Sequence, residues 1–145
     1  MQDNREGPHA ADGVQLGAMT LYPMPESVPR ARRWFRKFVD PSGLACSMDD
    51  CLLMISELVT NAVMYGRAEE EWRVRLDWWR DGGSLRVNVH NPGAPAAVRM
   101  SCPSDQDVHG RGLRLVDELS DSWSVAPSPY GGTMVSFVVH KAWPE

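Results

Sequence analysis

Apolar and polar residues alternate in two neighbouring segments near the middle of the chain. In residues 71–80, apolar side chains stand at every second position, as Trp72, Val74, Leu76 and Trp78. Residues 84–91 alternate in the same way, and the sequence Asp-Gly-Gly between the two segments is typical of a tight turn. A period of two indicates strands with one face in the core. We therefore predict a β-hairpin, with Trp78 inward and Trp79 outward.

Three other segments show the spacing of amphipathic helices. The first follows Ser27, a plausible N-cap, and ends at the turn sequence of residues 40–43. The second covers residues 48–65 behind a cap at Ser47, and the third covers residues 110–119. The apolar face predicted for the first helix consists of Val28, Ala31, Trp34, Phe35 and Phe38.

The remaining segments complete a small sheet. Residues 18–24 predict a strand at a sheet edge, because prolines interrupt its end, and residues 122–126 and 133–140 predict two closing strands. Between residues 91 and 110 the chain lacks periodicity, which favours a functional lid. The resulting order predicts an α+β two-layer sandwich, in which a mostly antiparallel sheet carries helices on one face. We expect residues 1–17 to be a disordered tail and residues 18–145 to form a single domain.

Composition narrows the class of protein. The chain has 145 residues, 43% of them apolar, and a formal net charge of -4, which argues against a dedicated nucleic-acid binder. The sequence contains neither a long apolar run nor a signal-peptide core, so we expect a cytoplasmic protein without a membrane span. Three cysteines without CxxC spacing indicate ordinary reduced thiols rather than a zinc site or a disulfide framework. His90 and His109 flank the predicted lid, and we interpret both as solvent-exposed.

The second helix carries a pair of polar residues suited to phosphate chemistry. Glu57 and Asn61 are four residues apart and therefore project from the same side of the helix. An amide oxygen is a suitable ligand for Mg²⁺, and a carboxylate can act as a general base. A polar edge on an ordinary amphipathic helix is the alternative interpretation of this pair.

Two further segments are weak signals taken singly. Asn91 ends a strand, and Gly93 would allow a flat ligand to approach the backbone, although the same residues suit a plain turn. Gly110, Arg111 and Gly112 open the third helix, where free backbone N–H groups and the helix dipole favour a phosphate. A glycine hinge is the alternative there.

Together, these segments resemble a known family. The sequences ELVTNAVMYG (57–66), LRVNVHNPG (85–93), GRGLRLVDELSDSW (110–123) and GGTMVSF (131–137) resemble the GHKL, or Bergerat-fold, ATPases. Within that superfamily, they are similar to the small bacterial anti-sigma-factor serine/threonine kinases that are abundant in actinomycetes. The resemblance extends over residues 18–140.

The resemblance implies a set of roles at the matching positions. Glu57 matches the general base and Asn61 the Mg²⁺ ligand. Asn91 matches the acidic residue that accepts a hydrogen bond from the adenine amino group of ATP. The other residues implied to bind the nucleotide are Gly93, Gly110, Arg111, Gly112, Leu113 and Thr133. The implied partners are a sigma factor and an anti-sigma antagonist protein, and a homodimer is expected because members of the family are often dimers.

Two departures from the family pattern leave more than one functional hypothesis. Asn91 stands where the family usually has Asp, and Pro95 stands where a second glycine is frequent. A neutral amide loses a charge-assisted bond, which would weaken ATP binding by several-fold to about tenfold. The first hypothesis is a kinase that binds Mg-ATP, sequesters a sigma factor and regulates transcription by partner switching. The second is a catalytically inactive regulator on the same scaffold, and the third is an unrelated metabolite-binding domain.

Overall fold

The structure is a computed structural model that describes residues 13–65, 73–91 and 108–144. Its helices and strands, in chain order, are β2 (Val14–Leu21), α1 (Ser27–Val39), the 3₁₀ turn η1 (Asp40–Ser42), α2 (Met48–Tyr65), β3 (Val74–Asp81), β4 (Ser84–Asn91), α4 (Val108–Leu119), β5 (Ser122–Pro127) and β6 (Thr133–Val139).

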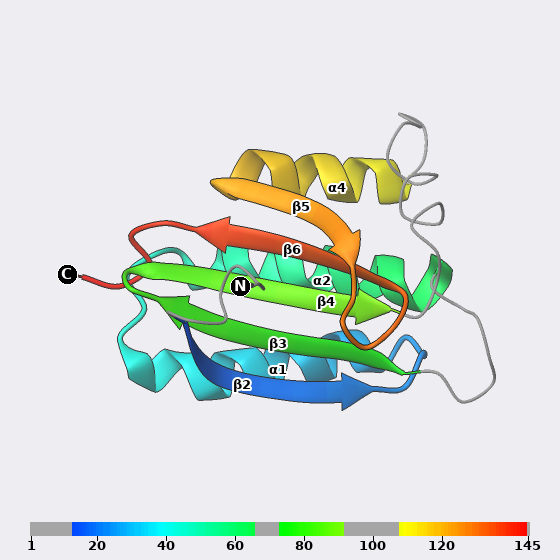
Figure 1. Cartoon of the computed structure of the whole chain (residues 1–145), viewed down its shortest axis with the longest axis horizontal. Coiled ribbons are helices and arrows are strands. Elements are labelled where there is room, and N and C mark those ends of the chain that lie inside the picture. Colours follow the sequence, from blue (N-terminus) through cyan, green and yellow to red (C-terminus); the bar gives the residue numbers. More distant parts are fainter. Residues whose placement is uncertain (1–12, 66–72, 92–107, 145) are drawn as a thin grey trace.

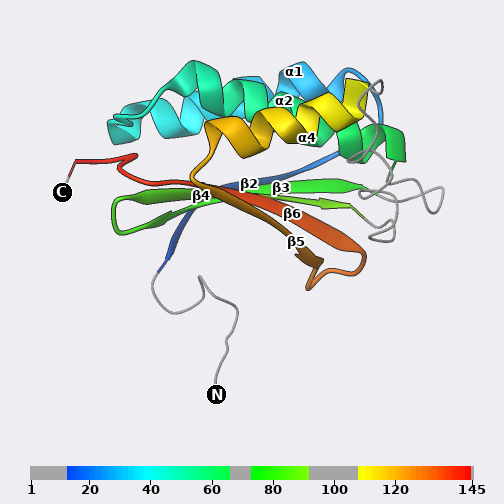
Figure 2. The same cartoon turned by 90° about the horizontal axis from the view of Figure 1, so that it is seen from above.

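The described strands form a five-stranded sheet in the order β2-β3-β4-β6-β5. Each neighbouring pair is antiparallel. Figure 1 shows the strands lying across α1, α2 and α4, and Figure 2 shows that these three helices cover the same face of the sheet. The other face has no helix over it in the described residues. The predicted α+β two-layer sandwich is confirmed, and β2 is an edge strand as expected.

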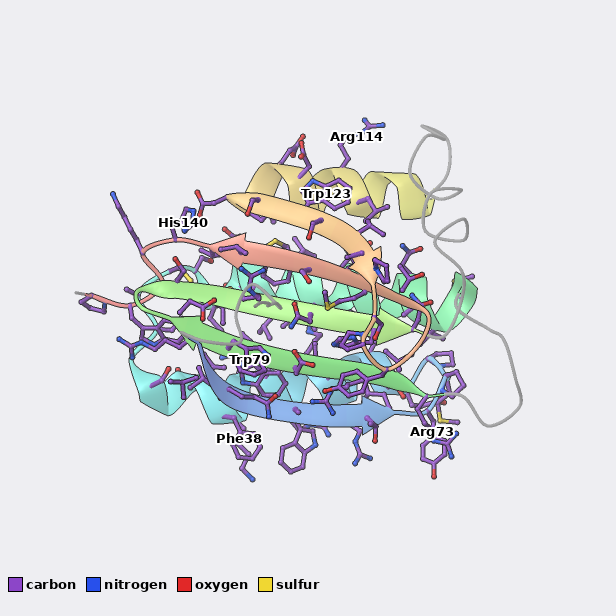
Figure 3. The ribbon with its side chains drawn as sticks, viewed as in Figure 1. Phe38, Arg73, Trp79, Arg114, Trp123 and His140 are labelled. Atoms are coloured by element: carbon purple, nitrogen blue, oxygen red, sulfur yellow. The ribbon has the colours of Figure 1, made fainter. Side chains whose placement is uncertain are left out.

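The core lies between the sheet and the helices. The predicted inward residues Val74, Leu76 and Trp78 are all buried there. The ring of Phe35 from α1 meets the ring of Trp78 edge to face, with centroids 5.4 Å apart. Aromatic pairs favour this geometry because the positive edge of one ring meets the negative face of the other. Trp79, the neighbour predicted to point outward, lies over β3 on the face without helices (Figure 3).

Helix α1 differs from the prediction at two positions. Ser27 is not the N-cap: it is the first helical residue, it is buried, and its Oγ donates a hydrogen bond to the carbonyl oxygen of Tyr22 at 2.6 Å. Phe38 was predicted on the apolar face but is 49% exposed, and its ring stacks on Trp34 at 5.2 Å. Val39 takes the buried place instead, because Ala31, Phe35 and Val39 are spaced by four.

Helix α2 has the bounds that the sequence predicted. Ser47 caps it, since the Asp50 backbone N–H donates to Ser47 Oγ at 3.1 Å. Asp49 and Asp50 lie in the first turn, where the helix dipole favours negative charge. The cap therefore fixes the first residue of α2, and with it the positions of Glu57 and Asn61 along the helix.

Strand β2 begins earlier than predicted. Residues 14–17 were assigned to the disordered tail, but they pair with β3 from Val14 onward. The pairing shifts register between Gln15 and Gly17, so the periodicity of the strand is interrupted. A Cβ atom at Gly17 would lie 2.4 Å from Cζ2 of Trp78. Gly17 therefore lets the edge strand pass close to a buried indole ring. Residues 1–12 of the predicted tail lie outside the described residues.

Candidate functional site

The predicted site segments come together at one end of the molecule. In Figure 1, the C-terminal end of α2, the C-terminal end of β4, the start of β6 and the N-terminal end of α4 all lie at the same end. Helices α2 and α4 pack against each other on the same face of the sheet. The fold thus brings together residues that are up to 76 positions apart, from Glu57 to Thr133.

Asn61 has an unused acceptor in a buried position. The residue is 6% exposed, and nothing in the described part of the chain donates a hydrogen bond to its Oδ1. Leaving a buried acceptor unpaired costs about 1–3 kcal/mol. Such an atom is available to bind a ligand.

Glu57 lies one turn before Asn61 on α2 and is half-buried. The two residues flank Leu58, which is buried in the core. Because packing in the core holds this part of α2 in place, the backbone positions of Glu57 and Asn61 are fixed. An amide oxygen and a carboxylate of this kind fit a hydrated Mg²⁺, which prefers oxygen ligands and retains waters and phosphate oxygens.

Asn91 and Thr133 are opposite each other at the end of the β4–β6 ladder. Both are buried, Asn91 at 4% exposure and Thr133 at 0%. The predicted strand-end residue is therefore close to the threonine of the GGTMVSF segment, although the sequence separates them by 42 positions. Gly93 and Pro95 lie outside the described residues, as does most of the predicted lid.

Helix α4 begins at Val108, two residues before the predicted start. Gly110 is consequently the third helical residue rather than the first. The N–H groups of the N-cap and of the first three helical residues have no partner within a helix, so the N–H of Gly110 belongs to this set and that of Arg111 does not. Leu113 is 2% exposed and packs in the core, where it secures the helix start rather than offering a surface to a ligand.

The fold and the arrangement of these residues define a class of protein: a small α+β domain with a candidate Mg²⁺ and phosphate site between two helices and the end of a sheet. The chain matches the family model of the histidine kinase-like ATPase domain over residues 22–139. It therefore belongs to this family of ATP-binding domains. Among curated proteins, no match to the chain was found. None of the described helices is long and apolar enough to cross a membrane.

The structure also shows a polar cluster that the sequence did not predict. It lies on the sheet face without helices and centres on Asp77, which is 3% exposed. Asp77 Oδ1 accepts hydrogen bonds from Asn88 Nδ2 at 2.7 Å and from Trp79 Nε1 at 2.9 Å. Arg75 Nε donates to Oδ2 at 3.0 Å.

His90 belongs to this cluster, so the prediction that it is solvent-exposed is wrong. It is 5% exposed, with Nε2 at 2.9 Å from Asp77 Oδ2 and Nδ1 at 2.8 Å from Ser128 Oγ. The alternation of apolar and polar residues placed His90 on the correct face of β4. It did not indicate that His90 is buried, because the burial comes from the turn after β5, which folds over this residue. His109 has no described side chain.

The electrostatics of Asp77 follow from this surrounding. Burial by itself raises the pKa of the carboxyl, but hydrogen bonds from His90, Asn88 and Trp79, together with the charge of His90, lower the pKa to about 2. Asp77 is therefore ionised at neutral pH, and its Oδ2 accepts a hydrogen bond from His90 Nε2. On its other side, His90 Nδ1 shares a hydrogen bond with the hydroxyl of Ser128.

A serine, a histidine and an aspartate in a hydrogen-bonded row invite comparison with serine hydrolases. Such enzymes need backbone N–H donors for the oxyanion, often from the residue after the nucleophile. Residue 129 is a proline and has no N–H, while the N–H of Tyr130 already donates to Ser128 Oγ at 3.1 Å. We assign the cluster a structural role: it fastens the β5–β6 turn to the centre of the sheet.

Described residues line two pockets away from the candidate site. One, of about 470 Å³, lies on the sheet face without helices beside Trp79, Arg86 and Tyr130. The other, of about 260 Å³, lies where β2 meets α1 and is lined by Tyr22, Glu26, Ser27, Arg30 and Arg33 among others. Neither includes Glu57, Asn61 or Asn91.

Proposed function

We propose that this protein is an anti-sigma factor and serine/threonine protein kinase that binds Mg-ATP and regulates transcription by partner switching. The observation that carries nucleotide binding is the buried, unpartnered Oδ1 of Asn61 on a scaffold of the histidine kinase-like ATPase family. The partner-switching role is supported by the resemblance of the four sequence segments to anti-sigma-factor kinases.

The proposed roles follow the placement of the residues. Asn61 would hold Mg²⁺, which when bound offsets negative charge on the phosphates. The free N–H groups in the first turn of α4 are suited to bind phosphate oxygens. Asn91 and Thr133 bind the base end of the nucleotide. Glu57 takes the proton of a serine hydroxyl on the antagonist protein while that oxygen forms a bond to the γ-phosphorus and ADP leaves.

Charge on α1 supports a protein partner. Arg30, Arg33 and Arg36 are exposed on this helix, and the first two line the pocket beside Tyr22. A predominantly positive surface accelerates association with an acidic one, although Arg36 also pairs with Asp49 at 3.8 Å. We therefore propose this face of α1 for contact with a sigma factor or an antagonist.

The first test is calorimetric titration with Mg-ATP. In the Asn61→Ala variant we expect binding weaker by about tenfold or more, since a lost contact of ~1.4 kcal/mol has that effect. Its stability should not fall, because the variant removes a buried acceptor that makes no hydrogen bond to the described residues. Ser56→Ala is the matched control, as it removes a hydroxyl of the same helix that donates to the Leu52 carbonyl oxygen. Equal affinities in all three proteins would overturn the assigned site.

A second candidate is a regulator without phosphoryl transfer, and the neutral side chain of buried Asn91 favours it. Asn91→Asp restores a charged acceptor, and we expect ATP affinity to rise by several-fold to about tenfold. A transfer assay with candidate antagonist proteins then separates the two functions. Phosphorylation by wild type, lost in Glu57→Gln with ATP binding retained, identifies the kinase. Binding of ATP and partner without phosphorylation identifies the inactive regulator.

A further inference from the structure

The start of α2 holds two cysteines in contact. Cys46 lies just before the Ser47 cap, and Cys51 lies in the first turn of the helix. Their Sγ atoms are 3.9 Å apart. Cys46 is half-buried, whereas Cys51 is buried in the core. They are five positions apart in the sequence, and the path of the chain into the first turn of α2 places them in contact.

The backbone on both sides of the pair is anchored. Ala45 N–H donates to the Ala142 carbonyl oxygen at 2.6 Å, and Cys51 N–H donates to the Ser47 carbonyl oxygen at 3.2 Å. The two sulfurs therefore remain neighbours while the protein is folded. A disulfide bond needs them about 2 Å closer, a distance within reach of small side-chain rotations.

We propose that Cys46 and Cys51 are a reversible dithiol–disulfide pair, a covalent modification site at the N-terminus of the helix that carries Glu57 and Asn61. The oxidant is a low-molecular-weight disulfide such as glutathione disulfide. The Cys46 thiolate attacks one sulfur of the oxidant, its S–S bond breaks, and one glutathione thiolate leaves. The Cys51 thiol then loses its proton and attacks Cys46 Sγ, which releases the second glutathione. Two thiols are oxidised and one disulfide is reduced.

The two thiols differ in exposure, and we therefore expect Cys46 to react before Cys51. Cys46 has a surface through which the oxidant can reach it, and Cys51 can reach only Cys46. Burial raises the pKa of Cys46, and the negative charges of Asp50 and Asp121 raise it further, against the lowering effect of its bond to Cys51. Burial and the neighbouring Cys46 sulfur raise the pKa of Cys51. Because the thiolate is the nucleophile, oxidation should be slow at neutral pH and faster in alkali.

The test is oxidation of the folded, full-length chain by glutathione disulfide, followed by alkylation, trypsin digestion and mass spectrometry. Both cysteines fall in one tryptic peptide, residues 38–67, while Cys102 falls in another, residues 100–111. We expect peptide 38–67 to lose two hydrogens and both alkyl groups, and to recover them after reduction. The rate should rise by about tenfold for each pH unit from 7 to 9, without a plateau.

Three variants make the order of reaction visible. In Cys51→Ser the peptide should retain one glutathione on Cys46, because the resolving thiol is missing. In Cys46→Ser no modification of peptide 38–67 is expected while the protein is folded. Cys102→Ser is the matched control and should oxidise like wild type. A stable glutathione adduct on wild-type Cys46, pairing of either cysteine with Cys102, or two alkylated thiols after oxidation at pH 9 would each overturn the proposal. None of these readouts depends on nucleotide binding.

Discussion

The two faces of the sheet are both buried in their centre, but different forces bury them. On the inner face, Leu76, Val87 and Phe137 pack against the helices and make no polar contact. On the outer face of the same strands, Asp77, Asn88 and Ser136 are 2–3% exposed and joined by hydrogen bonds. Hydrophobic packing tolerates changes of shape at moderate cost, whereas a polar network is stable only if each member keeps its partner. Stability of the inner face should therefore scale with volume, and that of the outer face with charge and pH.

The largest expected effect is on the inner face. Phe137→Ala removes a fully buried ring and should lower the free energy of unfolding by ~3–5 kcal/mol, through lost transfer energy and the cavity left behind. The matched variant is Val138→Ala, the next residue on β6, which is half-buried on the other face and should lower it by ~1 kcal/mol or less. Urea unfolding monitored by tryptophan fluorescence measures both. Similar losses would contradict the distinction between the faces.

The next effect tests the charge of the outer face. The pKa of Asp77 is lowered to about 2, so its ionisation stabilises the folded protein above pH 4, and this stabilisation is lost as the pH falls from about 4 to 2. The shift corresponds to about 2 kcal/mol. The stability difference between wild type and Asp77→Asn should thus shrink by ~1 kcal/mol between pH 6 and pH 3 in denaturant titrations.

Ser136→Ala is the control for that pH dependence. Its hydroxyl donates to Asn88 Oδ1 at 2.6 Å and carries no titrating group of its own. Its destabilisation should be about 0.5–1.5 kcal/mol and should not depend on pH. A constant difference for Asp77→Asn across the same range would show that the carboxylate does not govern the outer face.

An effect of ~1–3 kcal/mol, smaller than that of Phe137→Ala, is expected where the edge strand approaches the core. In Gly17→Ala the new methyl group would lie against the Trp78 ring, which cannot move away because Phe35 packs on it. Ala18→Thr adds more volume at the next residue, which is exposed, and should change the free energy of unfolding by less than ~0.5 kcal/mol. Thermal unfolding compares the two, and equal midpoints would show that the indole ring has room to shift.

The sequence correctly predicted the elements whose bounds depend only on the periodic spacing of apolar residues. Helix α2 and strand β4 have the predicted bounds because their apolar stripes are long and flanked by a cap and a glycine turn. The start of β2 was missed because Gly17 and the register shift break its alternation. Burial of His90 was missed because its partners Asp77 and Ser128 are 13 and 38 positions away, and alternation shows which face a residue occupies but not what covers it.

The candidate site was predictable to a similar extent. The helical period placed Glu57 and Asn61 on one side of α2, and the resemblance to a family indicated Asn91 and Thr133. The sequence could not show that Asn61 Oδ1 would be buried without a partner, since that depends on how α2 packs on the sheet. It also placed the glycines at the first residue of α4, although the helix starts two residues earlier.

The order of the strands has a consequence for the speed of folding. Strands β3 and β4 are joined by a short turn in which Gly82 has a φ of 60°, so this hairpin closes locally. Strand β2 pairs with β3 across all of α1 and α2, and contacts so distant in the chain form slowly because a long loop must first close. We expect the hairpin to form early and the β2 edge to close late, together with docking of the helix that carries Glu57 and Asn61. We therefore expect the candidate nucleotide site on that helix to be complete only after the slowest step of folding.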